Sequence, residues 1–126
     1  MKMYTASLQR LEKLRKEYTT ALFVSIARGI NCAKACDGVF KYFAPTQEIL
    51  NDYKRTGDWT EYEKRYRALL AEYDLKECFK ILRKHAIECG KDTIVLVCYE
   101  KENTYCHRRL VADAYNKLGC HITELS

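Results

Sequence analysis

The sequence predicts an α/β fold: a single compact domain over residues 1–126, with a mostly parallel sheet of about four strands flanked by helices and a helical insertion after the second strand. Three observations predict it. Short apolar runs alternate with longer amphipathic stretches that begin at capping residues. Such alternation is typical of a parallel sheet covered by helices. The 126 residues suffice for one core, and they contain no internal repeat, low-complexity tract or linker.

The predicted strands are apolar segments that end at polar or turn-forming residues. The clearest is the run TIVLVC, which is rich in β-branched residues, and the run ALFVSIA is the next. Shorter segments near the two ends of the chain complete the set. We expect strands at about 2–5, 21–27, 93–98 and 121–125.

The predicted helices begin at residues that can accept hydrogen bonds from the free N–H groups of a first turn. Two of them carry a capping box, because Asp58 is followed by Glu61 and Asp74 by Glu77. Glycines provide stop signals. The expected helices run from Ser7 to about Tyr18, from Pro45 and Thr46 to about Lys54, from Asp58 to about Tyr73, from Asp74 to Gly90, and from Cys106 to Gly119.

The composition excludes several classes of protein. A hydrophobic content of 48% with 31% charged residues is typical of a globular domain and argues against disorder. No apolar run reaches the roughly eighteen residues of a transmembrane helix, and residues 1–5 lack the apolar core of a signal peptide. We therefore expect a cytoplasmic protein without a membrane partner. Nothing in the sequence specifies an oligomeric state.

The seven cysteines favour reduced thiols over a disulfide framework. Their number is odd, and Cys78, Cys89 and Cys98 lie within regular apolar patterns. We expect Cys78 and Cys89 to be buried and unreactive.

Chemically reactive side chains gather around the turn that follows the strand 93–98. In open α/β sheets ligands bind outside the carboxyl ends of the strands, so this turn is the expected functional site. The side chains concerned are Cys98, Tyr99, Glu100, Cys106, His107 and Arg108.

Cys106 is the candidate nucleophile. A cysteine at a helix N-terminus beside cationic residues is expected to have a lowered pKa, which makes its thiolate reactive. The alternative is a small side chain that starts a helix and has no chemical role. Glu100 is either a solvated loop residue or a general acid or base that could also hold Arg108 in place.

Arg28 and Arg108 are candidate anion ligands. Arg28 follows the second predicted strand, and Arg108 lies at the start of a predicted helix. With that helix N-terminus, the two guanidinium groups would form an anion site. Exposed arginines without such a role are also common.

Cys98, Cys106 and His107 are candidate zinc ligands, but their spacing is not that of a zinc ribbon or knuckle, so we expect no metal and no cofactor. Cys32 and Cys36 lack a second ligand pair nearby in the sequence. There is also no Cys-x-x-Cys pair, phosphate-binding Cys-x5-Arg loop, dinucleotide-binding glycine motif or Walker loop.

The segments VLVCYEK (95–101) and YCHRR (105–109) resemble the hallmark of the bacterial and phage family called domain of unknown function (DUF) 488. The resemblance extends to the first strand, to VSIAR (24–28), to the helix 62–70 and to the last strand. In the family a glycine–histidine pair more often precedes Ser7, where this chain has Thr5 and Ala6.

This resemblance implies a compact α/β fold and a role in nucleotide or nucleic-acid processing. It places the site at the two Cys-containing motifs, with Arg28 across the sheet edge. We expect Cys106, Glu100 and His107 to be catalytic, and we expect a second group of residues to bind the anionic substrate. This group comprises Arg28, Arg108, Ser7, Cys98 and Tyr99.

Two functional hypotheses remain open from the sequence. The first is a small enzyme that acts on an anionic nucleotide or nucleic-acid substrate through this Cys/Glu/His/Arg site. The second is a non-catalytic module that binds nucleic acid or a partner protein with the same basic turn. The two hypotheses differ at Cys106, because only the enzyme needs a reactive thiolate.

Overall fold

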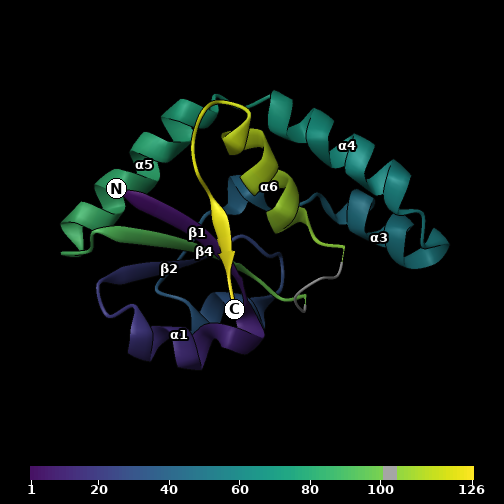
Figure 1. Cartoon of the computed structure of the whole chain (residues 1–126). Coiled ribbons are helices and arrows are strands. Elements are labelled where there is room, and N and C mark those ends of the chain that lie inside the picture. Colours follow the sequence, from purple (N-terminus) through teal and green to yellow (C-terminus); the bar gives the residue numbers. More distant parts are fainter. Residues whose placement is uncertain (101–104) are drawn as a thin grey trace.

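Parallel strands form the centre of the molecule. The computed structural model describes residues 1–100 and 105–126, and within these ranges five strands form one sheet in the order β3-β2-β4-β1-β5. The carboxyl ends of parallel strands share one edge of the sheet (Figure 1). The strands are β1 (Lys2–Ser7), β2 (Ala21–Ser25), β3 (Gly38–Val39), β4 (Thr93–Cys98) and β5 (Thr123–Leu125).

Helices cover both faces of the sheet, so the domain has three layers (Figure 1). On one face lie the 3-10 turn η1 (Leu8–Arg10) and the helices α1 (Leu11–Glu17) and α2 (Ile30–Ala35). Helices α3 to α6 lie on the other face, and α3 and α4 belong to the predicted helical insertion after β2. The remaining elements are η2 (Lys41–Phe43), α3 (Gln47–Thr56), α4 (Trp59–Ala71), α5 (Leu75–Glu88) and α6 (His107–Asn116). None of the helices within the described ranges is long and apolar enough to cross a membrane.

The central strand β4 is buried on both of its faces. Ile94 and Leu96 belong to the larger core beneath α3 to α6, whereas Val95 and Val97 belong to the smaller core beneath α1 and α2. A strand covered on both sides needs an apolar residue at every position, which accounts for the uninterrupted run TIVLVC. Cys98 also belongs to the larger core. Its side chain, at the end of β4, therefore lies on the face of the sheet that α4 and α6 cover.

The structure confirms the α/β class and corrects details of the prediction. Strand β2 ends at Ser25 rather than at residue 27, and β5 begins at Thr123 rather than at residue 121. The short β3 and α2 were not predicted, because two and six residues show too little periodicity. The prediction that Cys89 is buried is wrong: Cys89 is exposed as the C-cap of α5, beyond the apolar face of the helix. Lys101 of the quoted motif lies outside the described residues.

The predicted helix caps are present at α4 and α5. The Asp58 carboxylate accepts a hydrogen bond from the backbone N–H of Glu61, and the Asp74 carboxylate accepts bonds from Lys76 and Glu77. Each carboxylate therefore satisfies N–H groups that have no partner within the helix.

Replacing Asp74 by alanine should lower the free energy of unfolding by about 1 kcal/mol, because two N–H groups of the first turn of α5 lose their acceptor. Asp74→Asn is the matched control, since asparagine caps a helix about as well as aspartate. Urea unfolding followed by circular dichroism measures both variants. An equal loss in the two variants would show that the charge of Asp74, and not its role as a cap, stabilises the helix.

Candidate functional site

Four reactive side chains meet at the turn between β4 and α6. Cys98, Glu100, Cys106 and His107 each contribute one sulfur, oxygen or nitrogen atom, and these atoms all lie within 4.8 Å of one another. We call this set the Cys–Glu–His cluster. Cys98, Cys106 and His107 are buried, and Glu100 is half-buried. The cluster therefore lies at the carboxyl edge of the sheet, where the sequence analysis expected a site.

The two thiols share one carboxylate. The sulfur atoms of Cys98 and Cys106 are in contact, and each thiol donates a hydrogen bond of 3.3 Å to Oε2 of Glu100. The Cα atoms of the two cysteines are 8.0 Å apart. In protein disulfides this separation is usually about 4.4–6.8 Å, so a disulfide here would require the backbone to move. We therefore describe the pair as two adjacent thiols.

Hydrogen bonding fixes the tautomer of His107. Its Nε2 lies 2.7 Å from the backbone carbonyl oxygen of Ile26, which can only accept a hydrogen bond, so Nε2 carries the proton. Burial lowers the pKa of His107 to about 4, and the ring is therefore neutral at pH 7. The unprotonated Nδ1 lies 3.8 Å from Sγ of Cys106. Its lone pair is thus available to the cluster.

Arg108 lies behind the cluster and is fully buried. Its guanidinium binds the carboxylate of Glu124 through Nε at 2.6 Å and Nη2 at 3.3 Å. Its Nη1 donates to Sγ of Cys98 at 3.1 Å and to the carbonyl oxygen of Glu100 at 2.8 Å. The sequence analysis expected Arg108 to bind an anionic substrate. In the structure its guanidinium holds the carboxylate of Glu124 and donates a hydrogen bond to the sulfur of Cys98.

Three further predicted residues lie at the same edge of the sheet. Ser7 pairs with Cys98 in the β1–β4 register, is buried, and accepts a hydrogen bond from the N–H of Gln9. Tyr99 follows Cys98 directly and is 65% exposed. Arg28 is exposed and follows the end of β2, and its guanidinium binds Pro45 and Gln47 at the start of α3. The described contacts of Arg28 therefore tie the loop after β2 to α3.

Aromatic rings connect the cluster to the surface. Tyr105, which precedes Cys106, is 61% exposed and stacks on Trp59, with ring centroids 4.9 Å apart and planes 17° apart. Trp59 stacks on Tyr62, and Tyr62 on Tyr66. We call these four rings the aromatic stack. The ring of Tyr66 meets His107 edge-on at 5.4 Å, so the stack ends at the cluster. Burial, and to a smaller extent the charge of Glu100, raises the pKa of Tyr62, which is thus a neutral phenol at pH 7.

A surface pocket of about 320 Å³ lies beside the outer end of the aromatic stack. Trp59 and Tyr105 form its apolar part, and its charged lining consists of the cations Arg67 and Arg109 and the carboxylates of Glu63 and Asp113. Arg67 is paired with Asp113 at 2.9 Å, whereas Arg109 is exposed on the first turn of α6. The pocket therefore combines flat aromatic surface with a cation, three residues along the chain from Cys106.

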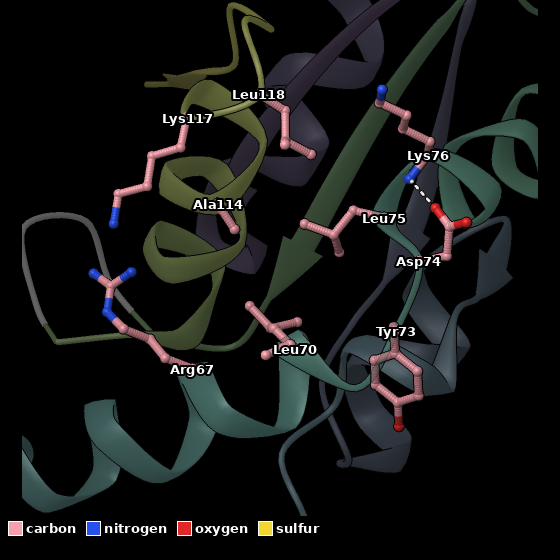
Figure 2. Close-up of a pocket in the computed structure, with 10 residues that line it drawn as sticks. Arg67, Leu70, Tyr73, Asp74, Leu75, Lys76, Ala114, Lys117 and Leu118 are labelled. Carbon is pink, nitrogen blue, oxygen red and sulfur yellow. Dashed lines mark hydrogen bonds between the residues drawn. The ribbon is translucent and has the colours of Figure 1, made fainter.

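A second cavity, of about 490 Å³, lies between α4, α5 and the end of α6, and Arg67 lines this cavity as well as the first pocket (Figure 2). Figure 2 shows Leu70, Leu75 and Leu118 around it, with Arg67 and Lys117 at one rim. Its described lining contains no residue of the Cys–Glu–His cluster, so the reactive groups of the turn do not reach it.

The sequence analysis missed two parts of the site. It assigned Glu100 as the carboxylate that could hold Arg108, whereas that carboxylate is Glu124 on β5, and no local pattern links these two residues. It also did not predict that the half-buried ring of Trp59 stacks on Tyr105 from a distant part of the chain. The aromatic residue directly before Cys106 was the available signal for such a surface.

Replacing Glu124 by alanine should destabilise the domain by about 3 kcal/mol, because the buried guanidinium of Arg108 loses its countercharge. This is the lower end of the usual range, since Glu124 is 27% exposed. Glu17→Ala is the control, because Glu17 pairs with Lys13 on the surface and such pairs contribute little. Urea unfolding measures both variants. Similar losses for the two variants would show that burial of Arg108 does not make its ion pair important for stability.

Comparison with known proteins gives one family. The model of the active DUF488-N3 subclade (DUF488-N3a) matches residues 3–119. No curated protein and no solved structure matches the chain. The matched range includes the Cys–Glu–His cluster, Arg108 and the whole aromatic stack. Because the model covers nearly the entire chain, the protein belongs to the DUF488 family.

Proposed function

We propose that this DUF488 protein is a small enzyme that acts on an anionic nucleotide or nucleic-acid substrate through the Cys–Glu–His cluster. The observation that carries the proposal is the convergence of two thiols, a carboxylate and a neutral imidazole within 4.8 Å at the carboxyl edge of the sheet. Enzymes that use nucleophilic or acid–base catalysis commonly bring groups of this kind together in a largely buried site.

The neighbouring surface supports the substrate class. Nucleobases stack on exposed aromatic rings, and Tyr105 and Trp59 present such a surface beside the cluster. Arg109 is exposed at the rim of the same pocket, where a phosphate group can reach it. The net charge of +5 favours an anionic ligand as well.

Within the proposed enzyme, the residues of the turn have different roles. Glu100 is the half-buried member of the cluster and transfers protons to and from the substrate. Arg108 acts as a positioning residue, because it holds the sulfur of Cys98 and the carbonyl of Glu100 at fixed places. Cys106 stays the predicted nucleophile of the sequence analysis. Arg28 remains a predicted anion ligand at the same sheet edge.

Nucleotides or short single-stranded oligonucleotides should quench the fluorescence of Trp59, which is the one tryptophan of the chain. Tyr105→Ala should weaken this binding about 5- to 100-fold, since stacking contributes about 1–3 kcal/mol per base. Tyr42→Ala is the control, because Tyr42 is also exposed but packs against Phe40 and Tyr73. Binding that is equal in the two variants would contradict the placement of the substrate at the aromatic stack.

Glu100→Gln should retain nucleotide binding and lose conversion of the substrate. An amide, unlike a carboxyl group, cannot accept a proton from the substrate and return it. The measurement is incubation with a panel of nucleotides and oligonucleotides, followed by mass spectrometry of the products. Binding without any conversion by the wild-type protein would instead support the non-catalytic binding module.

A further inference from the structure

We propose that Cys98, Cys106 and His107 bind a zinc ion, with the carboxylate of Glu100 at the fourth coordination position. This inference deepens the proposed function, because it concerns the same cluster, and it makes Cys106 a zinc ligand instead of the nucleophile. Zinc binding does not depend on the identity of the substrate. It departs from the sequence analysis, which expected no metal because the ligand spacing matches no common zinc motif.

The geometry of the donor atoms carries the inference. In a tetrahedral zinc site with Zn–S bonds of about 2.3 Å and Zn–N bonds of about 2.0 Å, neighbouring ligand atoms lie roughly 3.5–3.8 Å apart. Nδ1 of His107 lies 3.8 Å from Sγ of Cys106, both sulfur atoms lie 3.3 Å from Oε2 of Glu100, and all four donors lie within 4.8 Å of one another. The sulfur atoms of Cys98 and Cys106 are in contact, closer than such a site places them, so zinc binding must separate them. Among the common divalent ions, zinc is the one that a donor set of two thiolates, an imidazole and a carboxylate favours.

His107 is oriented as a metal ligand. A histidine that binds a metal almost always donates its other ring N–H to a backbone carbonyl, a carboxylate or water. Nε2 of His107 donates to the carbonyl oxygen of Ile26 at 2.7 Å, so Nδ1 presents its lone pair to the cluster. The ring of Tyr66 also packs edge-on against the ring of His107. Its orientation is therefore fixed before any ion arrives.

The charges around the cluster are suited to a divalent cation. Two thiolates and one carboxylate carry three negative charges, and a zinc ion offsets two of them. Arg108 donates a hydrogen bond to Sγ of Cys98, and such a bond stabilises a thiolate ligand. Glu100 is half-buried, whereas the other three ligands are buried. The coordination position that Glu100 occupies is therefore the one closest to solvent.

The test begins with the wild-type chain, without any substrate. Protein loaded with Zn²⁺ and desalted should retain one equivalent of zinc, measured by elemental mass spectrometry. Co²⁺ in place of Zn²⁺ should give the charge-transfer absorption of thiolate–cobalt bonds. Iodoacetamide should modify Cys98 and Cys106 faster after the metal has been removed with a chelator, while Cys89 and Cys120 react equally with and without metal because both are exposed.

Variants then assign the ligands. Cys98→Ser and Cys106→Ser should each weaken zinc binding at least about 100-fold, because loss of a residue that merely supports a ligand already costs about 10- to 100-fold. Cys89→Ser and Cys120→Ser are matched controls and should retain the ion. Glu100→Gln should also retain it, with lower affinity. Circular dichroism verifies that each variant is folded, and the wild-type chelation experiment does not depend on any variant.

Several outcomes would overturn the proposal: no zinc retained, no thiolate–cobalt absorption, alkylation of Cys98 and Cys106 unaffected by chelation, or zinc lost from Cys89→Ser or Cys120→Ser. These results are separable from the proposed function. Quenching of Trp59 by nucleotides without zinc binding would remove only the metal site. Zinc binding without any nucleotide binding or conversion would remove the proposed enzyme and leave the metal site.

Discussion

The ion pair between Arg108 and Glu124 is the interaction on which the arrangement of the turn depends. A guanidinium that is fully removed from water must have its charge and its N–H groups satisfied inside the protein. Glu124 supplies the charge from β5, while Cys98 and the carbonyl of Glu100 accept from Nη1 at the end of β4. One side chain thus joins an edge strand, the central strand and the first turn of α6. The same contacts that satisfy Arg108 fix where the sulfur of Cys98 and the backbone of Glu100 lie.

Burial separates the reactive groups from the surface that can recognise a ligand. The rings of Tyr105 and Trp59 are accessible beside Arg109, whereas Cys98, Cys106 and His107 are almost completely covered. In the proposed enzyme a base or sugar–phosphate would rest on the aromatic surface, and only a small group of the substrate would approach the half-buried Glu100. In such a place the field of each charge is screened less than in water, which strengthens the interaction of the cluster with any ion or polarised bond.

Local patterns were enough to predict most of the fold and the position of the site. The strand 93–98 was predicted because both faces of β4 are buried, and α4 and α5 because Asp58 and Asp74 cap them. Cys98 and Cys106 flank one turn, so their proximity also follows from the sequence. Other features depend on contacts between distant residues, such as the pairing of Arg108 with Glu124 and the stacking of Tyr105 on Trp59. The orientation of His107 depends on a backbone carbonyl, which no side-chain pattern reveals.

The need for charge neutrality relates two states of the cluster, one without a cation and one with a bound divalent cation. Arg108 is balanced by Glu124, so it does not supply a full countercharge for two thiolates beside Glu100. Without a cation, both thiols donate hydrogen bonds of 3.3 Å to the Glu100 carboxylate. A divalent cation replaces these protons and uses the same donor atoms. His107 serves both states unchanged, because its Nδ1 lone pair faces Cys106 in either case. The polar contacts of the turn thus hold the donor atoms together before any ion binds. This lowers the free-energy cost of ordering the ligand side chains when the ion binds.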